Sequence, residues 1–402
     1  MTSAELPPPD RDRPVVVLGA GYAGLAFAQR VARRARGRWP VVLVDRHPVH
    51  VLRTELYEIG RLARARGDPG PWTIPLAPVL DHRAVTVRPG EVKAIDPAAR
   101  AVELDSGRVD YGALAIGLGN VAAYYGVPGA PEHTFSVYRL REAQRLAEAI
   151  RELELRSAGL PPGRRPRILV VGGGSTGTEV AAEIAAEDWA RITGADARAP
   201  QVLLLTGTLP FLAGFPTSLA DRARALLRRR GVTMIEGLNV TKVEPNRLSL
   251  EDGSVLAFDL AVWCAGLEAP APVRALPVPH GRGGRIKVEP TLELPGFPGA
   301  FAMGDVIDLT DPATGAPVPL TAAAALAEGT AAAENLVARV EGRPLAPFRF
   351  RERGVVVALG PGSGAGSVRH VTIWGSPAAL LKRLVERDYA ASVERGSAPH
   401  LA

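Results

Sequence analysis

The chain has 402 residues, of which 47% are hydrophobic and 22% charged, and its net charge is +6. This length exceeds the ~250–300 residues that one hydrophobic core supports, so we expect more than one domain. The composition excludes a disordered protein, and no apolar run reaches the ~18 residues of a membrane-spanning helix. Residues 1–14 are rich in proline and lack the apolar centre of a signal peptide, so we expect a flexible tail and a cytoplasmic protein.

The first element expected after this tail is a buried strand that leads into a glycine loop. Val15–Leu18 is apolar throughout, as a strand buried on both faces requires. The loop then carries Gly19, Gly21 and Gly24, and a helix follows. The next apolar run ends at Asp45, 21 residues beyond the last of these glycines, where a carboxylate can accept hydrogen bonds from ribose hydroxyls. This order predicts a dinucleotide site, and a glycine turn without a ligand is the alternative.

A second unit of the same kind follows the Pro/Gly stretch 159–163, which we interpret as a linker. The apolar run Arg167–Val171 leads into Gly172, Gly174 and Gly177 and then into a helix. The following strand ends at Thr206, without the acidic residue that an NADH site usually has there. The pattern predicts a second dinucleotide site and leaves the choice between NADH and NADPH open.

The third part of the chain has a Gly-Asp motif and an alanine-rich helix. Residues 299–303 form an apolar strand that ends at Gly304 and Asp305. The helix is expected from Ala322 to about Val340, with Thr321 as its N-cap, and its positive end would stabilise negative charge on a ligand.

The C-terminal residues predict two strands and a short helix. The strands are expected at 355–359 and 368–374, joined by the Gly/Ser loop 360–367. A helix at 377–392 follows, with Ser376 as its expected N-cap. Its apolar stripe consists of Leu380, Leu381, Leu384, Val385 and Tyr389, with Lys382, Arg383 and Arg387 beside it. The helix could lie in a membrane interface, and packing on its own domain or in a dimer is the alternative.

Taken in order, these motifs resemble the two-dinucleotide-binding-domain flavoproteins, and most closely the type II NADH:quinone dehydrogenases. The resemblance covers roughly residues 15–359, and its further supporting segments are 41–46, 115–117, 125–129, 262–266 and 284–288. It implies an α/β fold with two Rossmann-like domains, the NAD(P)-binding domain inserted into the FAD-binding domain, and a small C-terminal region. The expected divisions are a tail at 1–14, an FAD domain at 15–121 and 273–345, an NAD(P)H domain at 122–272 and a C-terminal region at 346–402.

The resemblance also assigns expected site residues. The FAD contacts would be Gly19, Gly21, Tyr22, Ala23, Gly24, Asp45, Arg46, Val92, Gly117, Gly304, Asp305, Thr321 and Ala322. The NAD(P)H contacts would be Gly172, Gly174, Ser175, Thr176, Gly177, Ala265 and Gly266. Glu179 is expected beside the stacked flavin and nicotinamide rings, and the alternative is an exposed helix carboxylate.

Departures from the family pattern limit what the resemblance implies. Quinone-reducing members carry a Gln pair where this chain has Ala327 and Glu328, and Ala323 replaces another glutamine, so the acceptor is in doubt. Cys264 is the only cysteine, which excludes disulfide reductases and sulfide:quinone reductases and makes it most simply a core residue. No metal-ligand spacing is found.

The leading hypothesis is therefore an FAD-dependent enzyme that oxidises NADH, with NADPH left open, and reduces a quinone. One alternative is an NAD(P)H-dependent reductase of a ferredoxin- or rubredoxin-type protein, and another is an NADH-sensing flavoprotein with slow turnover. We expect no nucleic-acid partner. Attachment to the inner face of a membrane and formation of a homodimer are left open.

Overall fold

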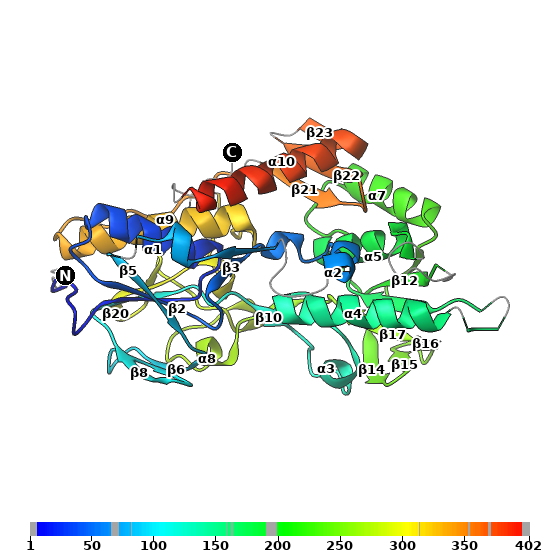
Figure 1. The fold of residues 1–402 in the computed structure, drawn as a ribbon, viewed down its shortest axis with the longest axis horizontal. Coiled ribbons are helices and arrows are strands. Elements are labelled where there is room, and N and C mark those ends of the chain that lie inside the picture. The colour runs from blue at the N-terminus through cyan, green and yellow to red at the C-terminus, as the bar shows by residue number, and fades with distance from the viewer. Residues whose placement is uncertain are drawn as a thin grey trace.

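The architecture comes from a computed structural model, which describes residues 6–65, 72–81, 83–157, 159–161, 164–189, 199–312, 314–352, 354–368 and 371–395. Two mainly parallel sheets, each covered by helices, lie side by side, and a small C-terminal sheet with one long helix joins them (Figure 1). Part of the predicted linker at 159–163, namely Pro162 and Gly163, lies outside the described residues.

The first sheet has the strand order β19-β20-β9-β1-β2-β5. Its central strand β1 pairs in parallel with β2 and with β9, and all four of its residues are buried, as the continuous apolar run predicts. Helices α1 and α9 pack along one another beside this sheet (Figure 1). The bounds are β1 Val15–Leu18, β2 Val41–Asp45, β5 Val85–Pro89, β9 Ala113–Ile116, β19 Glu293–Leu294, β20 Phe297–Ala302, α1 Tyr22–Arg34 and α9 Ala322–Val340.

Smaller elements complete this unit. An antiparallel ribbon has the order β6-β7-β8, a short pair joins β3 to β4, and helix α2 leads toward the second unit. Their bounds are β3 Val49–Val51, β4 Thr73–Pro75, β6 Val92–Asp96, β7 Ala101–Leu104, β8 Gly107–Asp110, α2 Ile59–Ala65 and the 3-10 turns η1 Arg53–Glu55 and η4 Gly304–Val306.

The second sheet has the order β13-β12-β11-β17, again with parallel pairing. Helices α4, α5 and α7 cover it, and an antiparallel ribbon β14-β15-β16 lies beside it. The bounds are β11 Arg167–Val171, β12 Gln201–Thr206, β13 Thr233–Glu236, β14 Val240–Glu244, β15 Arg247–Leu250, β16 Val255–Ala257, β17 Leu260–Trp263, α3 Ala130–His133, α4 Leu140–Ser157, α5 Ser175–Ala186 and α7 Thr217–Arg229. Helix α8, Ala271–Arg274, packs on β6 of the first unit.

The second unit is inserted into the first. Strands β9 and β20 are parallel neighbours in the first sheet, although the whole second sheet lies between them in sequence. The chain leaves the first unit through β10 (Val121–Ala122) and returns through β18 (Leu267–Glu268), and these two strands pair antiparallel at the crossing. This arrangement confirms the predicted fold class of two Rossmann-like units, one within the other. The domain boundaries given above stay predictions.

The C-terminal region differs from the prediction. The expected loop 360–367 contains a third strand, so the sheet has the order β21-β22-β23, with β21 Gly354–Ala358, β22 Gly364–Val368 and β23 Val371–Trp374. The glycines of β22 serve close packing rather than a turn, because a Cβ atom on Gly366 would lie 2.6 Å from the Val355 carbonyl oxygen. Helix α10, Gly375–Glu394, begins one residue before the expected cap at Ser376.

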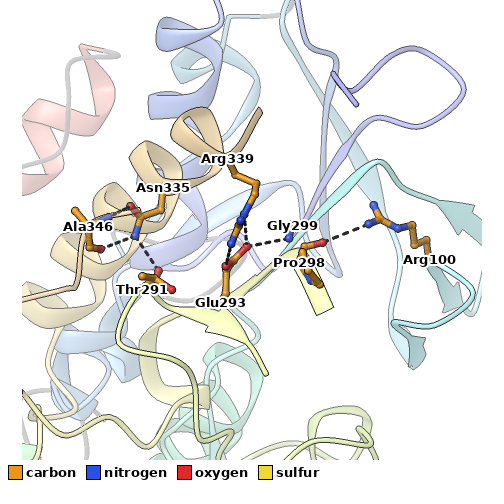
Figure 2. Close-up of polar contacts among 8 residues, drawn as sticks. All are labelled: Arg100, Thr291, Glu293, Pro298, Gly299, Asn335, Arg339 and Ala346. Atoms are coloured by element: carbon orange, nitrogen blue, oxygen red, sulfur yellow. Dashed lines mark hydrogen bonds and ion pairs between the residues drawn. The ribbon is translucent and has the colours of Figure 1, made fainter. Parts of the chain in front are cut away.

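A buried polar network fastens the edge of the first sheet to α9 (Figure 2). The Glu293 carboxylate accepts hydrogen bonds from the Arg339 guanidinium and from the Gly299 amide, the latter at 3.0 Å. Asn335 Nδ2 donates to the carbonyl oxygens of Thr291 and Ala346 at 2.9 and 2.8 Å. The N-terminal residues join this edge, since Leu6 is buried, and a Cβ on Gly299 would meet its side chain. Within residues 6–14, Leu6, Pro9 and Pro14 are buried and the residues between them are exposed, and the flexible tail stays a prediction.

Candidate functional site

A cleft of about 1400 Å³ lies between the two units. This volume exceeds the ~300–1,000 Å³ of typical small-molecule pockets, so the cleft has room for a ligand larger than one drug-sized molecule. Both glycine-loop units contribute to its wall, together with α9, the segments 346–352 and 354–357, and α10.

The first glycine loop presents an open helix N-terminus to this cleft. Gly19 has φ +97°, and a Cβ atom there would lie 2.4 Å from the Gly117 carbonyl oxygen. A Cβ on Gly24 would lie 1.8 Å from the Gly19 carbonyl oxygen, so Gly24 is needed for the tight packing of α1 on the loop. Gly21 is the N-cap of α1, where no side chain caps the helix, and a Cβ there would meet nothing within 4 Å. Uncapped N–H groups beside open space form a ready site for an anion.

Asp45 lies at the end of β2, beside this loop. Its Oδ2 accepts from the Ala20 amide at 2.8 Å and its Oδ1 accepts from the His47 amide at 3.0 Å. A carboxylate has about four lone-pair positions, so two remain for ligand hydroxyls. Asp45 and its neighbour Arg46 both line the cleft.

The second loop repeats this geometry. Gly172 has φ +120°, and a Cβ on Gly177 would lie 1.9 Å from the Gly172 carbonyl oxygen. Gly174 is the N-cap of α5, where again no side chain caps the helix. Cys264 is buried behind this loop, and burial raises the pKa of its thiol to about 12. Cys264 is therefore a packing residue, as expected.

Thr206 at the end of β12 is buried, with its methyl group against the position a Cβ on Gly173 would occupy. It therefore packs behind the second loop instead of facing a ribose. The next residues are held by Asn239, whose Oδ1 accepts from the Thr208 amide at 3.4 Å. As the sequence indicates, the position where an NADH site usually has an acidic side chain is occupied by Thr206.

Asp305 belongs to a polar chain that sequence reasoning missed in part. Asn120 Nδ2 donates to Asp305 Oδ2 at 2.7 Å, and Arg53 Nη2 donates to Asn120 Oδ1 at 2.7 Å. Burial raises the pKa of Asp305, while Arg53, Arg285 and the bond from Asn120 oppose that rise. Arg53 follows β3 and Asn120 follows β9, so three separate turns bring these groups together. The sequence signal was the polar Asn120 in the short turn that follows the buried strand β9.

Glu179 lines the cleft on α5 and is tied to the C-terminal helix. Its Oε1 accepts from the Ala358 amide at 3.0 Å and lies 3.5 Å from Lys382 Nζ. The same Nζ lies 2.9 Å from Glu386 Oε1 and 4.9 Å from the centre of the Tyr57 ring. Only 12% of the Glu179 side chain is exposed and it is ion-paired, so the exposed-carboxylate alternative is wrong.

Lys382 corrects the expected arrangement of α10. It was expected beside an apolar stripe with Arg383 and Arg387, but it points into the cleft wall, and only those two arginines are exposed. Burial alone would lower the pKa of Lys382, but Glu179, Tyr57 and Glu386 raise it well above its ordinary value. Burial raises the pKa of the Glu179 carboxyl, and Lys382 opposes that rise. Lys382 therefore stays charged and balances the two carboxylates.

Helix α9 begins at the cleft, as predicted. Thr321 Oγ1 accepts from the Ala324 amide at 3.2 Å and so caps the helix. Ala323 and Ala327 line the cleft, whereas Glu328 does not. Glu328 is buried on the other side, where its Oε2 accepts from the Gly304 amide at 2.6 Å, and burial raises its pKa to about 8. Of the two positions where the family has a Gln pair, only Ala327 can therefore affect a ligand in the cleft directly.

The structure brings most, but not all, predicted site residues to one surface. Those that line the cleft are Gly19, Gly21, Tyr22, Ala23, Asp45, Arg46, Gly117, Ser175, Thr176, Glu179, Gly304, Asp305, Thr321 and Ala322. Those that do not line it are Gly24, Val92, Gly172, Gly174, Gly177, Ala265 and Gly266. Val92 starts β6 and pairs with Leu104, and the position a Cβ would take on Gly266 is filled by the Tyr125 hydroxyl. Lining residues that sequence reasoning missed include Arg53, Asn120, Arg139 and Tyr138.

Among the described residues, we find no helix long and apolar enough to cross a membrane.

Comparisons with known proteins agree with this geometry. The sequence model of the family described as pyridine nucleotide-disulphide oxidoreductase matches residues 13–329. The chain is 28% identical over 382 residues to the demethylphylloquinone reductase of Synechocystis sp., covering 92% of this chain and 90% of that protein. It is 26% identical over 386 residues to the type II NADH:quinone oxidoreductase of Staphylococcus saprophyticus, covering 92% and 94%.

In three dimensions the chain is similar to NDH2 of Plasmodium falciparum, solved in complex with NADH. That similarity has a TM-score of 0.79 at 13% identity and covers 96% of both chains. The resemblance inferred from the motifs is confirmed. The chain belongs to the pyridine nucleotide-disulphide oxidoreductase family.

Proposed function

We propose that this protein is an FAD-dependent dehydrogenase that oxidises NADH and passes the electrons to a quinone. The observation that carries the proposal is that the helices after the two glycine loops, each uncapped at its N-terminus, both present residues of their first turn to one cleft large enough for two ligands. The relatives named above as quinone reductases span nearly the whole chain, which supports the same function.

The residues of the first unit fit an FAD molecule. The N–H groups at the start of α1, freed by Gly19, Gly21 and Gly24 and followed by Tyr22 and Ala23, would bind the pyrophosphate. Asp45 and Arg46 would hold the adenosine ribose, and the backbone at Gly117 would border the cofactor, whereas Val92 lies outside the cleft. Gly304 and Asp305 would bind the ribityl chain, and the α9 N-terminus at Thr321 and Ala322 would face the flavin ring.

The bound flavin would take two electrons from the nicotinamide and pass them to the acceptor. The protein's part is to position the partners and stabilise charge. The positive N-terminus of α9 would stabilise negative charge that develops at the ring system.

The second unit would bind the nicotinamide nucleotide. The N–H groups at the start of α5, after Gly172, Gly174 and Gly177, would bind its pyrophosphate, with Ser175 and Thr176 at the first helical turn. Glu179 would lie beside the reacting rings, whereas Ala265 and Gly266 do not line the cleft and are not assigned a contact. We assign NADH as the preferred donor because the relatives are named for it, and Thr206 in place of an acidic residue would leave some use of NADPH.

The acceptor side would lie along α9. Ala323 and Ala327 face the cleft with no hydrogen-bonding side chain, so an apolar ring system fits there better than a polar acceptor. A quinone has such a ring system.

The exposed face of α10 suggests where a quinone dissolved in a membrane would enter. Leu380 and Leu384 are exposed on this helix, with the exposed Arg383 and Arg387 beside them. Apolar side chains flanked by cations suit an anionic lipid surface, so we propose peripheral attachment at the inner face of the membrane. Co-sedimentation with vesicles containing phosphatidylglycerol tests this, and Leu384→Glu should abolish it. A homodimer formed through the same face would instead appear as a concentration-dependent change in mass.

The experiment that tests the proposed function starts from the purified protein. The bound flavin is identified in a denatured sample. A native sample is bleached anaerobically with NADH or NADPH and then mixed with a menaquinone analogue. Rapid return of the yellow colour supports the proposal. Return of colour only with a ferredoxin-type protein would contradict the quinone assignment, and absence of FAD would contradict the whole proposal.

Asp45 provides the matched variants. Asp45→Ala should weaken FAD binding by about tenfold or more, because it removes an ionised acceptor of ligand hydroxyls. Asp45→Asn keeps one acceptor oxygen and should bind FAD with intermediate affinity. Equal affinity in all three proteins would argue against the ribose assignment.

A further inference from the structure

The C-terminal helix reaches back across the molecule to the first glycine loop. Figure 1 shows α10 running from the small C-terminal sheet, beside the second unit, toward α1 and α9 of the first. Near its end, Tyr389 is buried, and its ring centre lies 4.9 Å from that of Tyr22 in the first turn of α1. The Tyr389 hydroxyl lies 2.9 Å from His50 Nε2 on β3.

His50 connects that hydroxyl to the loop itself. Its Nδ1 lies 2.7 Å from the Ala20 carbonyl oxygen, and the side chain is completely buried. Burial lowers the pKa of His50 to about 4, so the ring is neutral at ordinary pH, with one donor and one acceptor nitrogen. A carbonyl oxygen can only accept. Nδ1 therefore carries the proton and donates to Ala20, and Nε2 accepts from the Tyr389 hydroxyl.

The Ala20 residue is thereby held from both sides, since its own amide donates to Asp45 Oδ2 at 2.8 Å. The peptide group is planar and trans, so the Gly21 N–H points opposite to the Ala20 carbonyl. Fixing the direction of that carbonyl fixes the direction of the Gly21 N–H at the N-cap of α1. Within the described residues, this N–H has no hydrogen-bond partner, so it is free for a ligand.

We infer that His50 and Tyr389 are positioning residues of the flavin site, through which α10 holds the first glycine loop in the form that binds the FAD pyrophosphate. The inference rests on the proposed binding of FAD at this loop. It assigns a role in cofactor binding to a helix that begins about 350 residues after the loop in sequence.

The same helix is tied to the second unit. Lys382 lies seven residues before Tyr389, or about 10 Å along a helix, and pairs with Glu179 of α5 at 3.5 Å. Helix α10 thus contacts α5, which starts at the second loop, and is linked through His50 to the Ala20 carbonyl in the first loop. A displacement of α10 would therefore alter contacts near both proposed nucleotide sites.

The test compares FAD binding with protein stability. Tyr389→Phe keeps the ring against Tyr22 and removes only the hydroxyl. His50→Leu removes both hydrogen bonds, and His50→Gln keeps one donor and one acceptor. Leu384→Ala, on the exposed face of α10, is the matched control. For each apoprotein, FAD affinity is measured by flavin fluorescence during reconstitution, and the melting temperature is measured without FAD.

We expect the dissociation constant for FAD to rise about five- to tenfold in Tyr389→Phe and more in His50→Leu, as for the loss of one or two buried hydrogen bonds. His50→Gln should recover part of the loss, and Leu384→Ala should bind FAD as the unmodified protein does. If affinity is unchanged in Tyr389→Phe and His50→Leu while the apoprotein melting temperature falls, the contacts are only structural and the inference is overturned.

Failure of the proposed function gives a different result. An unmodified protein that binds no FAD would refute the function itself. An unmodified protein that binds FAD, together with an Asp45→Ala variant that binds it weakly, keeps the function whatever the Tyr389 and His50 variants show.

Discussion

Glu328 on α9 gives the sharpest prediction from the structure. It is buried, and its carboxyl group accepts from the Gly304 amide at 2.6 Å, directly beside Asp305. Burial raises its pKa from 4.5 to about 8, and Asp305 adds to the rise, while the bond from Gly304 opposes it. At neutral pH the group is therefore mostly protonated, with nearly the shape and hydrogen-bonding capacity of glutamine.

The sign of the pH effect follows from this raised pKa. The folded protein holds a proton that the unfolded chain has lost, so the stability is fully present below pH 4.5 and is lost as the pH rises toward 8. The difference between 4.5 and about 8, at about 1.4 kcal/mol per pH unit, amounts to roughly 5 kcal/mol. About half of this, roughly 2–3 kcal/mol, falls between pH 6 and pH 8.

The variant Glu328→Gln removes the titration and keeps an oxygen for the Gly304 amide. At about 2.1 cal/mol/K per residue, the 402 residues have an unfolding entropy of about 0.8 kcal/mol/K, so 2–3 kcal/mol corresponds to about 3 °C. We expect the melting temperature of Glu328→Gln, relative to the unmodified protein, to rise by about this amount between pH 6 and pH 8.

The assay is thermal unfolding followed by circular dichroism at pH 6, 7, 8 and 9. The control Glu334→Gln lies on the same helix but at its partly exposed face, where it pairs with Arg30 and Arg34. It should shift the melting temperature by a similar amount at every pH. Parallel curves for Glu328→Gln and the unmodified protein would refute the assignment of a protonated Glu328.

Three further predictions concern other parts of the molecule. Arg339→Met leaves the buried Glu293 without its cation and should lower the free energy of unfolding by about 3–5 kcal/mol in a urea titration; a loss below 1 kcal/mol would contradict the importance of this pair. Gly177→Ala places a methyl group 1.9 Å from the Gly172 carbonyl oxygen, so NADH affinity measured by fluorescence should fall by about tenfold or more, with the flavin spectrum unchanged. Normal NADH affinity would refute the need for close packing between Gly177 and the Gly172 backbone. Burial lowers the pKa of His50 from 6.5 to about 4, so its contribution to the free energy of unfolding, about 3 kcal/mol in all, is present above pH 6.5 and lost as the pH falls toward 4. His50→Gln should make the free energy of unfolding less dependent on pH between pH 7 and pH 5, and an unaltered slope would argue against a neutral His50.

The parts of the fold that could be predicted from the sequence are those that depend on residues close together in the chain. The continuous apolar runs before Gly19 and Gly172 are buried parallel strands, because a strand covered on both faces needs apolar residues at every position. The N-cap at Thr321 follows from a side-chain bond that spans three residues, so its signal is local as well.

The parts that sequence did not predict depend on contacts between distant segments. Strand β22 was expected as a loop because glycine is typical of turns, but Gly366 is there because the Val355 backbone comes too close for a side chain. Helical spacing put Lys382 beside exposed arginines, whereas its partner Glu179 is about 200 residues away in sequence. The chain from Arg53 through Asn120 to Asp305 joins three turns that no local pattern relates.

During synthesis, the ribosome delivers β9 long before its sheet neighbour β20, because residues 117–296 lie between them. At about 5–20 residues per second, these 180 residues take roughly 10–35 s, during which the edge of β9 has no strand to pair with. The inserted unit has all the strands of its own sheet by Trp263 and can fold within that interval. The sheet that is begun first is thus completed after the inserted one, and an unpaired strand edge of this duration exposes a newly made chain to aggregation.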